Sequence, residues 1–230
     1  MSLKSYFGLM LIACNMLECN STTFTEEKIN PQQLSEWTTL GKGKTSIKNE
    51  EFVFEEINDS DGFFVVSPIN YEGDIILKYK IKAMSDSSVL ITLFSASDSQ
   101  NDTTLTFPAK NAKPDDIWKW RSAMNHYNLT FNNKSHGYTP FFYKNITSLE
   151  RGFHIRKEEN ITAPYQWVSV EIGRVKERVW FSLNGDIVFE QTDTDPLKGG
   201  HVLFRISGTN SDTDTILAKA AIKDLVIFHK

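Results

Sequence analysis

Polar and apolar residues alternate with a period of two along several short stretches of the chain. In residues 74–83 (DIILKYKIKA), isoleucine, leucine and tyrosine fall on one side and three lysines on the other. This period is typical of a β-strand with one buried and one solvent-exposed face. Residues 167–172 and 179–190 alternate in the same way. Residues 89–96 form a more continuous apolar run, as expected for a strand that is covered on both faces.

Turn signals separate these stretches. Asn184-Gly185 divides residues 179–190 into two halves, and such a two-residue turn needs positive φ at both positions, which this pair accepts. Two glycines precede a further strand at residues 201–206, and residues 216–229 supply the last one or two strands. No segment in the middle or at the end of the chain has a convincing helical period. The pattern predicts an all-β jelly-roll sandwich of two antiparallel sheets.

The first twenty residues predict an export signal. Residues 6–13 form an apolar run that is too short to span a bilayer but fits a secretory signal. The run ends Leu-Ile-Ala-Cys, which resembles a bacterial lipobox, so Cys14 is the expected lipidation site. We therefore expect residues 1–20 to be signal and anchor, residues 21–45 a tether and lead-in, and residues 46–230 the jelly-roll domain. The protein would then be an exported, periplasmic or outer-membrane lipoprotein, whose one membrane contact is the lipid anchor.

Two alternatives for the N-terminus stay open. One is plain secretion, including that of a glycoprotein, because the chain carries seven Asn-x-Ser/Thr sequons. The other is a short buried helix.

Composition excludes several classes of function. The chain has 230 residues and a net charge of −4, which gives it no global attraction for nucleic acid. Its two cysteines, Cys14 and Cys19, cannot form a disulfide framework or a cysteine-based zinc site. We expect no metal or cofactor, apart from a structural calcium ion that residues 58–62 or 212–214 can ligate through oxygen atoms. Acid-rich turns that bind no calcium have the same sequence pattern.

Residues 117–157 break the alternating pattern. They are long for a connection in a compact domain, and such connections are usually functional or disordered, but this one is too aromatic for disorder. The segment carries seven Lys or Arg and one Glu on an otherwise acidic chain. Aromatic rings stack on sugars and arginine binds carboxylate or sulfate, so we expect an anionic oligosaccharide here. The alternative is that its lysines are simply solvated.

The strand at 201–206 offers a second candidate. His201 and Arg205 share one of its faces, and if the other face is core, both point into a groove. A strand at the edge of a sheet, blunted by charge, would look the same. Paired carboxylates at the spacing that a retaining jelly-roll glucanase needs are absent from the sequence, which argues against glycoside hydrolysis.

Together, residues 167–172, 179–185 and 199–206 resemble the concanavalin A-like jelly rolls of bacterial polysaccharide-utilisation loci. More narrowly, residues 45–230 are similar to the YesU-like family, whose members show Arg-Gly-Phe-His, here residues 151–154, before the Asn-Gly hairpin. They also show Gly-Phe-Arg near the penultimate strand, where this chain has Leu-Phe-Arg at 203–205. One departure is Asn128, which stands where the family has a histidine, with His126 two residues earlier.

The resemblance implies action on oligosaccharides that end in a uronic acid, of the ulvan type. The implied reaction is a β-elimination that dehydrates the terminal uronate to a 4,5-unsaturated product, and it makes the protein a carbon–oxygen lyase. A sugar-binding lipoprotein without catalysis and a glycoside hydrolase are the alternatives. In this reaction, His126 or His154 would act as the base and Tyr138 or Tyr143 as the acid. Arg151 or Arg205 would bind the uronate carboxylate. Further substrate contacts are expected from Trp118, Trp120, Arg121, Asn128 and His201.

Overall fold

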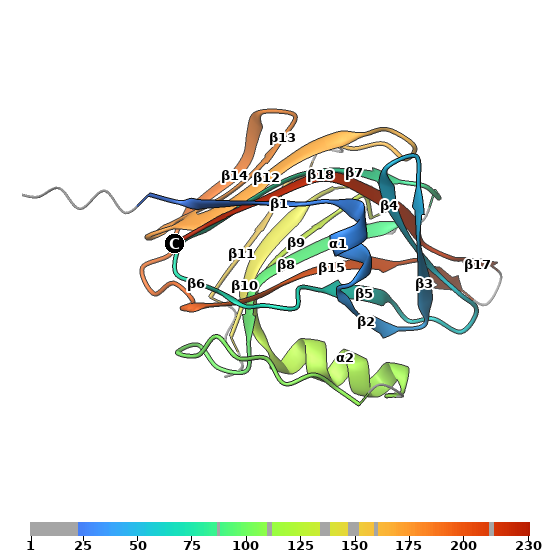
Figure 1. Ribbon diagram of the computed structural model, residues 1–230, viewed down its shortest axis with the longest axis horizontal. Coiled ribbons are helices and arrows are strands. Elements are labelled where there is room, and N and C mark those ends of the chain that lie inside the picture. The colour runs from blue at the N-terminus through green and yellow to red at the C-terminus, as the bar shows by residue number, and fades with distance from the viewer. Residues whose placement is uncertain are drawn as a thin grey trace, which may run out of the picture.

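The computed structural model describes residues 23–86, 88–109, 112–133, 139–146, 152–158, 161–211 and 214–230. Its strands form two large antiparallel sheets that pack face to face (Figure 1). Sheet A has the order β14 (Asp186–Thr192), β13 (Arg178–Leu183), β12 (Val168–Val175), β7 (Ile75–Ala83), β18 (Lys219–His229), β4 (Glu51–Glu56), β3 (Gly43–Lys48), and β1 (Thr25–Ile29) pairs with β18.

Sheet B faces sheet A across the core, and it includes residues 125–131, 141–145 and 153–156, which the pattern left unassigned. Its order is β11 (Phe153–Arg156), β10 (Phe141–Asn145), β9 (Asn125–Phe131), β8 (Val89–Ser97), β15 (Gly199–Ser207), β5 (Phe63–Val66), β2 (Thr38–Gly41), and β6 (Tyr71–Glu72) pairs with β15. The short strands β16 (Thr209–Ser211) and β17 (Asp214–Ile216) pair antiparallel. The helices are α1 (Pro31–Ser35) and α2 (Pro114–Ala123).

The main core lies between the sheets and follows the predicted alternation. In β7, the alternating side chains of Ile75, Leu77, Tyr79 and Ile81 are buried. The ammonium groups of Lys78 and Lys80 reach acids on neighbouring strands. β8 is buried on both faces, as its continuous apolar run predicts. The Asn-Gly hairpin is also confirmed, because Asn184 and Gly185 have φ of 52° and 95° between β13 and β14.

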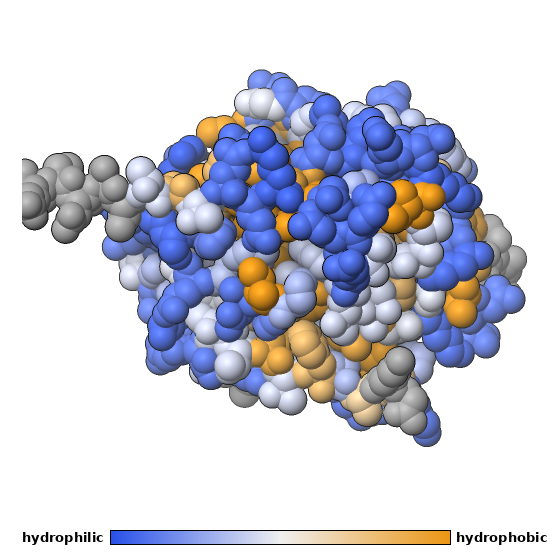
Figure 2. All heavy atoms as spheres, in the orientation of Figure 1, coloured by the Kyte–Doolittle hydropathy of each residue, from blue (hydrophilic) through white to orange (hydrophobic). Residues whose placement is uncertain are grey.

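A second apolar cluster lies on the opposite face of sheet B, beneath α2. Ile117 and Met124 pack there against Phe64, Leu93 and Leu203. Figure 1 shows α2 on the far side of sheet B from sheet A, so this sheet is covered by sheet A on one face and by the helix on the other. The exposed surface in Figure 2 is largely hydrophilic, with apolar residues in scattered groups. No helix in the described ranges is long and apolar enough to cross a bilayer.

Two predictions about the organisation of the chain are wrong. The tether predicted for residues 21–45 is wrong over its described part, because β1 pairs with β18 in sheet A and β2 pairs with β5 in sheet B. Residues 117–157 are not one long connection, because they contain most of α2 and all of β9, β10 and β11. The helix was missed because Ile117 is the one buried residue within its bounds, so it lacks an apolar stripe. The predicted signal at residues 1–20 lies outside the described residues.

A buried ion pair lies inside the sandwich. Lys144 and Asp193 are 2% and 8% exposed, and the Nζ–Oδ2 distance is 3.0 Å. The Tyr127 hydroxyl donates to the same carboxylate at 2.6 Å, and the Leu197 amide donates to that hydroxyl. Burial and the Asp193 carboxylate raise the pKa of Tyr127 well above its usual value. Lys144 is therefore neither solvated nor available to a ligand, contrary to both interpretations of the basic segment.

The substitution Lys144→Met should be strongly destabilising, because it leaves the Asp193 carboxylate buried without its cation. We expect the free energy of unfolding to fall by about 3–5 kcal/mol, measured by urea denaturation. Lys78→Met is the matched control, since Lys78 and Glu171 form a half-exposed pair that should contribute less than about 1 kcal/mol. Equal losses in the two variants would show that the buried pair does not stabilise the fold.

Candidate functional site

The outer face of sheet B, turned away from sheet A, carries the candidate site. Alternation along β9 sends its apolar side chains into the main core and leaves His126 and Asn128 outward. The same alternation turns Tyr143 of β10, His154 of β11 and Arg205 of β15 outward. Five of the residues predicted from sequence therefore share one face.

Strand register gathers most of these side chains around Tyr143. Tyr143 pairs with Asn128 on one side and with His154 on the other. The ring centroids of His126 and His154 lie 5.9 Å and 5.7 Å from that of Tyr143. His126 and Asn128 lie on the same face, two residues apart, as a strand requires. The structure thus brings together two histidines, a tyrosine and an asparagine from three neighbouring strands.

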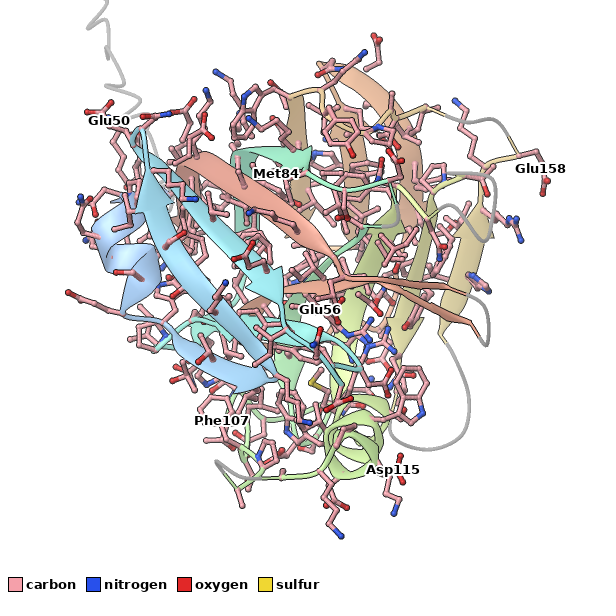
Figure 3. The ribbon with its side chains drawn as sticks, turned by 90° about the vertical axis from the view of Figure 1, so that its right-hand side faces the viewer. Glu50, Glu56, Met84, Phe107, Asp115 and Glu158 are labelled. Atoms are coloured by element: carbon pink, nitrogen blue, oxygen red, sulfur yellow. The ribbon has the colours of Figure 1, made fainter. Side chains whose placement is uncertain are left out.

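The helix α2 adds a cation and an aromatic ring to this group. Arg121, in its last turn, donates from Nη2 to the Asn128 side-chain oxygen and to the Tyr143 hydroxyl oxygen, both at 3.1 Å. Its guanidinium lies 5.1 Å from the ring centroid of Trp118, which is 50% exposed. Figure 3 views α2 nearly along its axis, with Asp115 directed away from the sheet. The helix thus places Arg121 and Trp118 at the edge of the site.

Arg205 is the second cation, and it is 6% exposed. Its guanidinium lies 5.3 Å from the ring centroid of Phe64, and Nη2 donates to the Asp61 carbonyl at 3.3 Å. Burial and the charge of Arg121 lower the pKa of Arg205 to about 9, so it remains charged at neutral pH. The guanidinium groups of Arg121 and Arg205 therefore place two like charges at the outer face of sheet B, and that of Arg205 is almost fully desolvated.

His126 is neutral, and its proton can be placed. The Nδ1 atom lies 3.0 Å from the Met124 carbonyl, which can only accept, so Nδ1 carries the proton. The Nε2 atom then presents a lone pair, and it is buried without a hydrogen-bond partner among the described residues. Burial, followed by the charge of Arg121, lowers the pKa of His126 to about 3.

The site is rich in donors and poor in acids. The seven strands from β11 to β2 contain no Asp or Glu in the residues that define them. The Nε atoms of Arg121 and Arg205 are buried and lack hydrogen-bond partners within the described ranges. Buried polar groups are normally satisfied, so these two N–H groups are exceptions in a region whose strands carry no acid.

Two predicted contacts belong elsewhere. Trp120 donates from Nε1 to the Thr106 carbonyl at 2.7 Å and packs edge-on to Phe64, so it holds α2 on the sheet. The Nδ1 atom of His201 lies 2.8 Å from the Ser67 carbonyl, and its ring contacts Phe107, so it faces a different loop from the Arg121 group. The sequence could not place these two side chains, because it does not show which residues the helix and this loop cover.

The remaining predictions concern residues without a described position. Tyr138, Arg151 and Cys14 lie outside the described residues, as does part of the 212–214 calcium candidate. Among the described residues, no group of three His, Cys, Asp or Glu side chains is placed to hold a metal ion.

Gly62 was missed as a contributor to the site. The sequence offers residues 58–62 as a calcium loop, but Gly62 has a φ of 105° and lies against the guanidinium of Arg205. A Cβ atom there would lie 2.5 Å from Nη2 of Arg205. The one feature of the sequence that pointed to Gly62 is its place after an acidic turn, and this feature is unspecific.

Comparison with known proteins identifies the architecture. No family model and no curated protein sequence matches the chain. A Bacillus subtilis protein of unknown function with a galectin-like fold is 17% identical, with a TM-score of 0.70 over 90% of this chain and 98% of that one. A Bacillus licheniformis β-glucanase is 10% identical, with a TM-score of 0.60 over 91% and 99%. The fold is a galectin-like and concanavalin A-like jelly roll.

A further match extends the range of proteins that share this jelly roll. A carbohydrate-binding module from Bacillus subtilis is 12% identical, with a TM-score of 0.52 over 84% of this chain and 94% of that one. At such identities the likeness shows the fold alone, because folds of this kind host unrelated functions. The narrower resemblance to the YesU-like family finds no support in these matches.

The buried neutral His126 should make stability depend on pH. An unfolded chain protonates this histidine near pH 6.5, whereas the folded protein does so near pH 3. The stabilisation is therefore complete above pH 6.5 and is lost as pH falls towards 3, by up to about 1.4 kcal/mol per pH unit. His126→Asn, which can still donate to Met124, should flatten this slope in urea denaturation series. The exposed His154→Asn is the control, and an unchanged slope in the His126 variant would contradict the assignment.

Proposed function

We propose that the protein binds a uronate-containing oligosaccharide on the outer face of sheet B and catalyses β-elimination at the uronate. The observation that carries the proposal is the meeting of Arg121, Tyr143 and the unprotonated His126 Nε2 on a face whose strands contain no acid. The jelly-roll fold is compatible with this proposal, since it occurs in a glucanase and a carbohydrate-binding module.

The reaction needs three kinds of group. The C5 proton of a uronate is weakly acidic, and cations on the carboxylate stabilise the charge that develops when it leaves. A base takes that proton, the electron pair of the broken C5–H bond forms the C4=C5 double bond, and the C4–O bond breaks. An acid protonates the departing oxygen, which leaves as water in a dehydration or as a sugar hydroxyl in a lyase reaction.

The candidate residues have matching properties. Arg205 and Arg121 would neutralise the carboxylate with N–H groups that have no partner among the described residues. Tyr143 would act as the acid, since Arg121 donates to its hydroxyl oxygen and would stabilise the phenolate that remains. His126 or His154 would act as the base. Burial is the larger cause of the low pKa of His126, and a carboxylate bound beside Arg121 would offset the smaller cause, the charge of Arg121.

Binding without catalysis is the second candidate, and one observation favours it. The pKa of His126, about 3, makes this residue a weak base in the unliganded protein. The exposed Trp118 ring beside Arg121 would suit a sugar-binding platform in either case. Hydrolysis by a carboxylate pair is disfavoured, because such a pair would have to come from outside the strands of this sheet.

We also propose that the protein acts outside the cytoplasm, as a periplasmic or outer-membrane lipoprotein. This rests on the signal-like residues 1–20 and on Cys14 at the end of the lipobox-like sequence.

The first experiment mixes the purified protein with uronate-containing oligosaccharides, including sulfated ones with saturated ends. Ultraviolet absorbance reports the conjugated double bond of the unsaturated product. A rise without chain shortening would support a dehydratase, and a rise with shortening would support a lyase. Binding without any rise on the whole panel would refute elimination and leave the carbohydrate-binding function.

Tyr143→Phe should lower kcat on the best substrate by at least about 100-fold with little change in KM, because the ring remains and the proton donor is lost. Tyr165→Phe is the control, since this exposed tyrosine lies outside the site. His126→Ala and His154→Ala should be assayed in parallel. If both histidine variants kept full turnover, neither would be the base.

A further inference from the structure

The guanidinium of Arg205 is held by contacts with one loop and one aromatic ring. The guanidinium has Gly62 against it, the Phe64 ring 5.3 Å from it and the Asp61 carbonyl bound to it. Gly62 and Asp61 belong to the loop between β4 and β5. The position of this loop therefore decides where the guanidinium lies.

Glu56, the last residue of β4, holds that loop. It is 5% exposed, and its Oε1 atom accepts hydrogen bonds from the Gly62 amide and the Ser60 hydroxyl, both at 2.8 Å. Its Oε2 atom accepts from the amides of Gly208 and Ala218 at 2.7 Å and 2.9 Å. Figure 3 labels Glu56 where β4 ends, at the side of the sandwich that carries the loop. One carboxylate thus ties the loop to both ends of the β16–β17 segment.

We propose that Glu56 is a positioning residue, which fixes the loop that orients Arg205 for an anionic ligand. Its functional meaning rests on the function proposed above, while the positioning itself can be measured without a ligand. The geometry is specific, because a Cβ atom at Gly62 would lie 2.5 Å from Nη2 of Arg205, so the loop leaves the guanidinium little room on this side. Glu56 also adds a nearby negative charge that favours the buried cation.

The test compares Glu56→Gln with Glu55→Gln. Glutamine keeps the size of Glu56 but places an amide NH2 group where one oxygen accepted from backbone N–H groups. Glu55 is the adjacent residue, and its carboxylate pairs with Lys44 and Lys219 on the outside of sheet A. Both variants remove one charge from the same strand, and only one of them touches the loop.

The first readout is the NMR signal of the Arg205 Nε–H group, assigned by its loss in Arg205→Lys. In the unmodified protein, this buried N–H should exchange slowly with water. Glu56→Gln should accelerate its exchange roughly tenfold or more, and Glu55→Gln should leave it unchanged. Gly62→Ala, which pushes directly on the guanidinium, should shift the same signal. If Glu56→Gln lowered the melting temperature but left the signal and its exchange unchanged, Glu56 would be merely structural and the proposal would be wrong.

The second readout is binding of the uronate oligosaccharide and of its methyl ester, measured by calorimetry. Glu56→Gln should weaken binding of the free uronate roughly tenfold and that of the uncharged ester little, because Arg205 acts on the charge. In the Arg205→Lys background, Glu56→Gln should add almost no further loss. Equal weakening for acid and ester would overturn the positioning role. Absence of uronate binding in the unmodified protein would instead refute the proposed function, and the NMR readout would still decide the role of Glu56.

Discussion

The packing of α2 against the outer face of sheet B is the interaction on which the candidate site depends. Apolar contacts from Ile117 and Met124 to Phe64 and Leu203 hold the helix there. The same packing brings Arg121 within reach of Asn128 and Tyr143, and the charge of Arg121 acts on the buried His126. An open sheet face would leave these groups hydrated, with ordinary pKa values and weak electrostatic interactions. The helix converts a row of polar side chains into a partly dry cationic surface.

The two sheets differ in how their outward cations are paired with acids. On sheet A, lysines of β7 pair with acids on adjacent strands, as in Lys78–Glu171 and Lys80–Asp224, so its charges compensate one another. On sheet B, the outward cations have no acid in their own strands, and Arg205 instead contacts a carbonyl oxygen and an aromatic face. Burying such a cation is costly to folding, and for Arg205 the nearby negative charges of Asp61 and Glu56 offset part of that cost.

The sequence predicts the sandwich well and the site in part, and the difference has a physical cause. Strands with one wet face, such as β7 and β12, display the two-residue period directly, and Asn184-Gly185 marks the hairpin between β13 and β14. β9 does not, because its outward residues His126 and Asn128 are polar yet buried under other parts of the chain. The helix α2 shows no stripe, since it buries little of its own surface. Residue types alone could therefore indicate Arg121, Tyr143 and Arg205 as site residues. They could not show that Trp118 lies beside Arg121 while Trp120 holds the helix on the sheet, or that Gly62 lies against Arg205.

The alternation of side chains along β9 has a consequence for how such a protein can change. Every second residue serves the interior, and the residues between them serve the outer face, so the two sets occupy the same strand without sharing contacts. Substitutions in one set can accumulate while the other set stays intact. One scaffold can thus exchange its surface chemistry freely, and chains that are only 10% identical can keep a common shape while presenting unrelated groups to their ligands.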